Sequence, residues 1–502
     1  MKQIDTRDPS QAGRRFPNTL VFTGYAAPVR IEGDAFDLEV IGDIPPELHG
    51  YYIRNSADHQ FPPLNDDDLF LNGDGMLHQV GIHAGHADLR TRYVHTEKYK
   101  LERSARRALF GAYRNMYTDD PSVNGKERTT ANTSVVWHAG RLLALKEASR
   151  PVQIEPQTLA TLGNYDFAGK LGSQAFTAHP KIDPRTGEMV AFGYFTKTVA
   201  DNIIEIFYID REGRLTRTES FDAPYPSMVH DCALSEHYVI FAICPMICDW
   251  ERVKNGEPFF HWDDRQPTLV AVVPREKGGA SRVRWFRSPK AVMQTHSFNA
   301  WEEGQLLHLE HFVTETGWLS QFPDINDPAA EEKPPFAYRW TLNLESTAGS
   351  FTSIRIFPHV GEMPMIDLRF LTQKTRHFWF GTTNLALGPA LPRGPKGPPF
   401  TCLGHFDAEK ETLDYWYAGA ASSPEEPVFV PRSPGAEQGD GWLMAIVGRR
   451  AENRTDLVIL DALNLPAGPV ATIKFPCRVH EGFHGVWVPN RAAAGGHHGG
   501  GS

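Results

Sequence analysis

The sequence predicts an all-β fold in which small antiparallel sheets repeat around a ring, as in a β-propeller. One unit recurs along the 502 residues: an apolar, β-branched run, an acidic residue, a short turn and a second strand. Clear copies lie at 141–163, 203–221, 400–419 and 456–475. The 43 Gly and 38 Pro indicate many tight turns rather than long helices. Repeated antiparallel units without alternating helices favour radial repetition.

Each unit carries its own strand and turn signals. In 203–221 the pair Glu212-Gly213 separates two strand-like runs and is typical of a hairpin. Further strands are expected at 237–244 and 268–274. At roughly 50–70 residues for each blade with its insertions, about seven blades fit. A two-sheet sandwich of this length would need splitting into domains, and no linker is visible, so we expect a single domain over 1–490.

Two segments interrupt the strand pattern. The region from about 98 to 130 begins with a stretch, 98–115, that reads as a short helix running into a loop. The region 313–337 is a long, Pro-rich insertion. Long loops in compact proteins usually form lids or substrate walls, so we expect both to form cap insertions. Residues 491–502 are expected to be a flexible tail, which removes His497 and His498 from the candidate site residues.

Composition and charge exclude several classes of partner. The formal net charge is −10, and no basic footprint for nucleic acid is visible. The N-terminal residues lack the apolar core of a signal peptide, and no apolar run is long enough for a transmembrane segment. The five cysteines form a sparse, odd set, in which Cys244 and Cys248 lack the second pair of a zinc site. We expect reduced thiols and a cytoplasmic location.

Four of the 21 histidines stand out by context, because each lies near an expected strand start, with small or apolar neighbours and a turn close by. They are His179, His230, His296 and His484. They come from distant segments, as expected if four blades each supply one ligand to a central axis, and unlike a local zinc knuckle.

The other histidine clusters are weaker candidates. His308 and His311 are three apart and would face opposite sides of a strand. His83 and His86 fall in a turn and are expected to be solvated. His480 could pair with His484 only on a helix, which this segment does not resemble.

Four imidazoles would form a neutral nitrogen site suited to Fe, Cu, Ni or Zn, and the residues alone leave that choice open. Such ligands normally donate their second N–H to carboxylates. Three residues suit that role, although each taken alone reads as a surface charge: Glu147, Glu362 and Glu426.

Together, these segments resemble the carotenoid cleavage oxygenase family. The resemblance runs from GDIPPELHGYYIRN (42–55) through FLNGDGMLHQV (70–80) to HEGFHGVWVP (480–489). It implies a seven-bladed β-propeller with a cap of loops and short helices over one face. It also implies Fe(II) held by the four histidines, with the three glutamates supporting them, and cleavage of an alkene by O₂ to two carbonyl products.

Within that family the sequence looks like the bacterial lignostilbene (stilbene-cleaving) dioxygenase branch. The similarity rests on Tyr113 in LFGAYRN, Lys146 in LLALKEA and Thr133 in TANTSVV. It implies cleavage of the central double bond of 4-hydroxystilbenes, such as lignin-derived stilbenes or resveratrol, to two aromatic aldehydes. Lys146 and Tyr113 would bind the phenolate, so that charge moves through the ring to the double bond. Thr133 would overhang the open iron position.

Two expectations concern side-chain direction. Adjacent residues on a strand face opposite sides, so Lys146 could face the substrate while Glu147 faces a histidine. The branch has a phenylalanine directly before NGDGM, where this sequence has Leu71, with Phe70 one residue earlier. A one-residue shift on a strand turns a side chain away, so Phe70 should not replace that ring. Leu71 should then change which stilbene fits.

Two alternatives remain open. An apocarotenoid-cleaving dioxygenase would share the metal site, but Arg103, Arg106 and Arg107 in the cap favour a soluble substrate. A propeller acting only as a binding scaffold would retain four histidines and three carboxylates without use. The family branch also suggests a homodimer.

Overall fold

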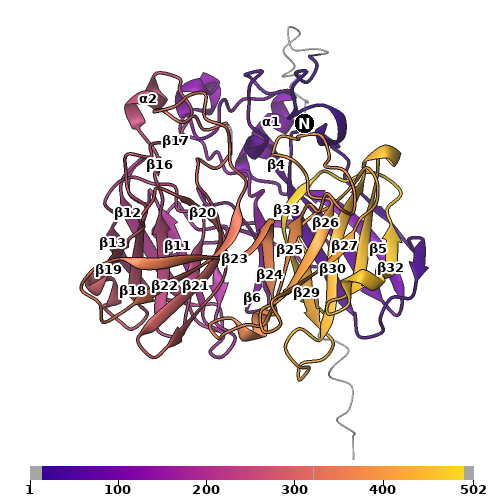
Figure 1. Ribbon diagram of the computed structural model, residues 1–502. Coiled ribbons are helices and arrows are strands. Elements are labelled where there is room, and N and C mark those ends of the chain that lie inside the picture. The colour runs from indigo at the N-terminus through magenta and orange to yellow at the C-terminus, as the bar shows by residue number, and fades with distance from the viewer. Residues whose placement is uncertain (1–13, 320, 491–502) are drawn as a thin grey trace, which may run out of the picture.

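The computed structural model describes residues 14–319 and 321–490, which form a seven-bladed β-propeller (Figure 1). The first four blades contain the following strands. Blade 1 holds β1 (Gly33–Ala35), β3 (Gly50–Asp58), β4 (Asp74–His83), β5 (His86–Tyr93) and β33 (Gly482–Pro489). Blade 2 holds β6 (Ser134–His138), β7 (Arg141–Leu145), β8 (Val152–Ile154) and β9 (Thr161–Asn164). Blade 3 holds β10 (Lys181–Ile182), β11 (Met189–Tyr194), β12 (Ile203–Ile209) and β13 (Leu215–Asp222). Blade 4 holds β14 (Cys232–Leu234), β15 (Tyr238–Ile243), β18 (Leu269–Pro274) and β19 (Arg284–Arg287).

The remaining three blades follow in chain order. Blade 5 holds β20 (Met293–Glu303), β21 (Leu306–Thr314), β22 (Phe336–Asn343) and β23 (Phe351–Val360). Blade 6 holds β24 (Glu362–Ile366), β25 (His377–Thr382), β26 (Cys402–Asp407) and β27 (Thr412–Tyr417). Blade 7 holds β2 (Val40–Gly42), β28 (Ser422–Pro424), β29 (Val428–Pro431), β30 (Gly441–Arg449), β31 (Arg454–Asp461) and β32 (Pro469–Lys474).

Burial follows the position of each strand in its blade. The middle strand β11 is buried along its whole length, whereas the outer strand β13 alternates between buried and exposed residues. Middle strands pack against neighbouring blades on both faces, which explains their continuous apolar runs. The expected Glu212-Gly213 hairpin joins β12 to β13, and Gly213 has the positive φ of +81° that this turn needs.

The ring is closed by strands from the two ends of the described chain. In blade 1, the C-terminal strand β33 pairs with β3, with Tyr52 opposite Trp487. In blade 7, the N-terminal strand β2 pairs with β32, with Ile41 opposite Thr472. Each end of the described chain therefore completes a sheet formed mainly by the other end, which joins the first and last blades.

Short helices and loops cover one end of the ring. At the top of Figure 1 lie α1 (Glu97–Ala105), α2 (Trp250–Lys254) and the two-stranded β16 (Met246–Ile247) and β17 (His261–Trp262). The expected helix is confirmed as α1, whose N-cap Thr96 accepts a hydrogen bond from Tyr99 N. The insertion expected at 313–337 is the connection between β21 and β22. No helix in the described ranges is long and apolar enough to cross a membrane.

Two further connections were not predicted from the strand pattern. Residues 244–267, between β15 and β18, carry β16, α2 and β17, and residues 383–400 join β25 to β26. The tail expected at 491–502, with His497 and His498, lies outside the described residues.

Candidate metal centre

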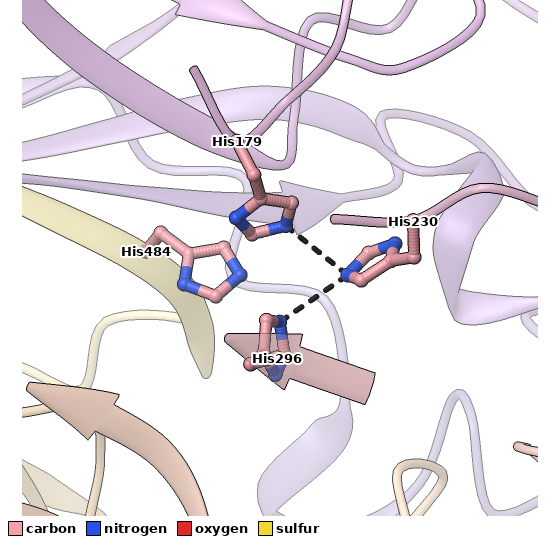
Figure 2. A group of neighbouring side chains, drawn as sticks. All are labelled: His179, His230, His296 and His484. Carbon is pink, nitrogen blue, oxygen red and sulfur yellow. Dashed lines mark hydrogen bonds between the residues drawn. The ribbon is translucent and has the colours of Figure 1, made fainter. Parts of the chain in front are cut away.

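The four histidines singled out in the sequence meet on the propeller axis. His179 and His230 lie in the loops before β10 and β14, His296 is in β20 and His484 is in β33. One nitrogen from each ring lies within 4.8 Å of all the others. The Nε2 atoms of His179 and His230 are 3.1 Å apart, and those of His230 and His296 are 3.2 Å apart (Figure 2).

This arrangement fits one transition-metal ion. Imidazole nitrogens at right angles around an ion, each about 2.1 Å from it, would lie about 3 Å apart. The two measured separations agree with that value, and the 4.8 Å limit accommodates a pair on opposite sides of an ion. Because imidazole nitrogen is a borderline-soft ligand, the cluster suits Fe, Cu, Ni or Zn better than Mg or Ca.

Three carboxylates hold three of these rings. Glu147 Oε2 lies 3.2 Å from His230 Nδ1, Glu362 Oε2 lies 2.6 Å from His296 Nδ1, and Glu426 Oε1 lies 2.7 Å from His484 Nδ1. All three glutamates are buried, so reading each alone as a surface charge was wrong. When each Nδ1–H donates to its carboxylate, the Nε2 lone pair faces the centre of the cluster.

Glu147 is kept ionised by its neighbours. Burial alone would raise the pKa of this carboxyl group, but the hydrogen bond from His230 and the charge of Arg114 outweigh it, giving a pKa of about 2. The guanidinium Nη1 of Arg114 is 3.6 Å from Glu147 Oε1 and also donates to Tyr194 Oη at 2.9 Å. Burial and the other imidazoles hold the pKa of His179 well below its usual value, which keeps that ring neutral and able to bind a metal.

Asp231 is a positioning residue that the sequence analysis missed. Its buried carboxylate accepts hydrogen bonds from Lys181 Nζ at 3.1 Å and from the backbone N of Ser297 at 2.8 Å. It therefore ties the segment of His230 to the strand of His296. The signal was present, since an acidic residue directly follows His230.

A cavity of about 570 Å³ lies over the histidines. His230, His296 and His484 border it. The residues expected at the substrate, Leu71, Tyr113 and Lys146, also border it, as does Thr133, which was expected over the open iron position. The backbone O of Thr133 accepts a hydrogen bond from His484 N at 3.3 Å, which places this residue beside the histidine cluster.

Lys146 carries a buried amino group without an ion-pair partner among the described residues. Its Nζ donates to the backbone O of Leu71 at 3.0 Å and to Asn132 Oδ1 at 3.3 Å, both of them neutral acceptors. Burial lowers the pKa of Lys146 to about 7. The amino group lies 5.1 Å from the centre of the Tyr113 ring.

Tyr113 completes this corner of the cavity. Its hydroxyl donates to Glu147 Oε1 at 3.5 Å, and burial raises the pKa of the phenol. Lys146 and Glu147 follow the end of β7, and they do diverge, one toward Leu71 and the other toward His230.

The expectation for Phe70 was wrong. Residues Phe70–Asn72 form a 3₁₀ turn rather than part of a strand. In such a turn, successive side chains are about 120° apart and not 180°. Phe70 and Leu71 therefore both border the cavity. The ring of Phe70 packs 6.0 Å from that of Phe483.

The cap supplies cavity residues that the sequence did not single out. Trp318, in the predicted 313–337 insertion, packs its ring 4.5 Å from that of His230 and 5.7 Å from that of His296. The connection 383–400 also lines the cavity, at Lys396 and Phe400 among others. Its run of Pro and Gly was a visible loop signal.

The remaining histidines and cysteines lie elsewhere. His308 and His311 are buried in blade 5, where His308 Nδ1 contacts Thr341 Oγ1 at 2.9 Å, and His83 and His86 are exposed as expected. His480 Nε2 contacts the backbone O of Ala26. All five cysteines are free, so Cys244 and Cys248 form no disulfide.

The fold and the cluster together define a class: seven-bladed propellers with four axial histidines that could hold a metal ion. A model of the RPE65 family (retinal pigment epithelial membrane protein) matches residues 26–489, and the chain belongs to this family of carotenoid oxygenases.

Named relatives lie within that family. The chain is 43% identical to lignostilbene-alpha,beta-dioxygenase isozyme III of Sphingomonas paucimobilis, over 94% of this chain and 98% of that one. It is 40% identical to isoeugenol monooxygenase of Pseudomonas nitroreducens, with the same coverage of 94% and 98%. The crystal structure of Pseudomonas brassicacearum lignostilbene dioxygenase superposes with a TM-score of 0.90 at 37% identity, covering 95% of this chain and 100% of that one.

Proposed function

We propose that the protein is a non-haem Fe(II) dioxygenase that cleaves the central double bond of 4-hydroxystilbenes with O₂, giving two aromatic aldehydes. The observation that carries this proposal is the unpaired, buried Lys146 beside Tyr113, in a cavity bordered by three of the four clustered histidines. The names of the relatives at 43% and 40% identity support a phenolic alkene as substrate.

In this proposal His179, His230, His296 and His484 hold the metal ion. Fe(II), when bound, would supply the activation of O₂. Glu147, Glu362 and Glu426 fix the tautomers of three rings through the Nδ1 hydrogen bonds. Thr133, at the cavity wall beside His484, limits the room over the cluster.

Lys146 accepts the proton of the substrate's 4-hydroxyl group at Nζ. Because its pKa is about 7, a large share of the free protein holds this amine neutral at physiological pH. The resulting ammonium–phenolate pair is a charge-assisted contact in a site of low polarity, where it is strong. Tyr113, neutral because burial raises its pKa, donates a hydrogen bond to the phenolate oxygen in place of its 3.5 Å contact with Glu147. Electron density then moves from the phenolate through the ring to the double bond.

The contact with Lys146 and Tyr113 also distinguishes between the other candidate substrates. Isoeugenol also carries a 4-hydroxyphenyl group on an alkene, so the 40% identical relative makes it a second candidate. An apocarotenoid offers no phenol to Lys146. The basic cap residues are a weaker argument against an apocarotenoid than expected, because two of them are paired with carboxylates. Arg103 lies 3.6 Å from Glu32, and Arg107 lies 2.7 Å from Asp120. If the protein were only a binding scaffold, it would not need three buried carboxylates that accept hydrogen bonds from histidine Nδ1 atoms.

The test is anaerobic reconstitution with Fe(II), followed by exposure to air with 4-hydroxystilbene, resveratrol, isoeugenol and a β-apocarotenal. We expect aromatic aldehydes from the first two substrates, identified by mass spectrometry, and about one Fe per chain. Lys146→Met should keep its iron and lose most turnover of the phenols, because the phenolate loses its counter-ion. Cleavage of the apocarotenal alone, or full activity of Lys146→Met, would refute the proposal.

Two further points stay predictions. Free thiols at all five cysteines, four of them buried, support a cytoplasmic location. A homodimer would be checked by light scattering on the Fe(II)-loaded protein.

A further inference from the structure

The cavity over the histidines contains a second lysine that the proposed chemistry does not use. Lys396 lies in the connection 383–400 and borders the same cavity as Lys146. Its Nζ donates to the backbone O of Gly482 at 2.6 Å and of Glu481 at 3.4 Å. It also lies 3.9 Å from the centre of the Phe483 ring.

The charge of Lys396 is not neutralised locally. The nearest carboxylates already have partners, since Glu425 pairs with Arg54 at 2.7 Å and Glu481 pairs with Arg450. In the described part of the chain, no carboxylate lies within ion-pair distance of Lys396. The formal charges of Lys396 and these two pairs sum to +1. Burial lowers the pKa of Lys396 to about 8, which reflects the same lack of compensation.

Lys396 thus resembles Lys146 and differs from Lys98. Lys146 and Lys396 both border the cavity and donate only to neutral oxygens. Lys98 is as deeply buried as Lys146, but it lies 3.1 Å from Asp74 and 2.8 Å from Glu102. A structural lysine in this protein is paired, whereas the two cavity lysines are left with unused capacity for an anion.

The two cavity lysines contact chain segments that carry different histidines. Lys146 directly precedes Glu147, the partner of His230, and Lys396 binds the carbonyl two residues before His484. His230 and His484 face each other across the cluster in Figure 2. Along the cavity wall, Leu71 contacts Lys146, Phe70 packs on Phe483, and Phe483 contacts Lys396. Both lysines therefore border the stretch of cavity wall formed by Leu71, Phe70 and Phe483.

We propose that Lys396 forms a second polar subsite, which binds an acidic group, a carboxylate or an ionised phenol, on the substrate ring farther from Lys146. This inference rests on the proposed stilbene cleavage and narrows it, because the preferred substrate then carries a polar group at each end. Two contacts, one at each ring, would also fix the position of the substrate in the cavity.

The test uses bibenzyls, which lack the double bond and cannot be cleaved. Binding of 4-hydroxybibenzyl and of its 4'-carboxy derivative would be measured by calorimetry on the Fe(II)-loaded protein under anaerobic conditions. We expect the carboxylated compound to bind at least tenfold more tightly to the wild type. Lys396→Met should remove this preference, because the surplus charge is lost. Lys396→Arg should keep most of it.

Lys290→Met is the matched control, since it removes one positive charge at an exposed ion pair with Glu315, outside the cavity. It should leave the tenfold preference intact, and thermal melting should confirm that each variant is folded. Equal binding of both compounds by the wild type, or an unchanged preference in Lys396→Met, overturns the inference. If the preference holds but no stilbene is cleaved, the subsite stands and the proposed reaction fails. If 4-hydroxystilbene is cleaved but the wild type binds both bibenzyls equally, only the proposed subsite fails.

Discussion

At the scale of single residues, the environment of an amino group decides its role. Lys98 and Lys146 are both nearly inaccessible to solvent, yet burial lowers the pKa of Lys146 to about 7, whereas Asp74 and Glu102 overcome burial and raise that of Lys98. Both residues look alike in the sequence, because each is a lysine next to a glutamate. Their difference depends on which carboxylates the fold brings near, so the sequence alone could not predict it.

The pKa of Lys146 predicts how activity depends on pH. Neutral Lys146 must accept the proton of a neutral phenol, so kcat/KM reports the titration of this amine in the free protein. Below pH 7 the amine is protonated, and we expect kcat/KM for 4-hydroxystilbene to fall about tenfold per pH unit. Above the pKa of about 7 it should level off, until the phenol itself ionises. Steady-state rates between pH 5.5 and about 9 would measure this profile.

Lys146→Arg is the control for this profile. Arginine stays protonated throughout this range and cannot accept the proton. The variant should therefore show a low rate without the rise near neutral pH. The same rise in Lys146→Arg, or a rate that falls as the pH increases, would contradict the assignment of the proton to Lys146.

At the scale of elements, the cap helix α1 is fixed to blade 1 and in turn fixes the loop that carries Tyr113. Lys98 of α1 pairs with Asp74 of β4, and Glu102 accepts hydrogen bonds from Leu109 N at 2.9 Å and Phe110 N at 3.1 Å. The helix itself was predictable from local sequence. Its attachment was not, because it depends on a charge pair between residues in two different elements.

Replacement of Lys98 by Met should destabilise the protein by about 3 kcal/mol, because two buried carboxylates lose their cation. Lys100→Met changes an exposed residue of the same helix and should stay within about 0.5 kcal/mol of the wild type. Denaturant unfolding followed by circular dichroism would measure both. Equal free energies of unfolding for the two variants would show that the ion pairs of Lys98 do not stabilise the protein.

At the scale of the whole molecule, the ring places residues from distant parts of the chain on one axis. His179, His230, His296 and His484 come from blades 3, 4, 5 and 1, or from the loops that lead into them. Blade 1 is itself built from both ends of the described chain. A metal ion at this point would therefore link blades that are otherwise connected only through their neighbours.

Metal removal should lower the thermal stability of the whole ring. An ion that binds only the folded state at one hundred times its Kd stabilises that state by about 2.7 kcal/mol. We expect the Fe(II)-loaded protein to melt at a higher temperature than the chelator-treated protein, in a single transition if residues 1–490 form one domain. His484→Ala should melt at the same temperature with and without Fe(II). If Fe(II) still raises the melting temperature of His484→Ala, the ion binds elsewhere in the protein.

Local sequence patterns were enough to predict many of the strands, the hairpin turns and the residue types at the site. Strand patterns and hairpin signals depend on neighbours a few residues away, and for that reason units such as 203–221 were predicted correctly. The family motifs likewise named the histidines and glutamates that meet on the axis. Other features could be seen only in the folded protein: Phe70 joins Leu71 at the cavity, 383–400 forms part of its wall, and Lys146 and Lys396 lack the partners that Lys98 has. Those features depend on closure of the ring and on burial, which bring together side chains that no local pattern connects.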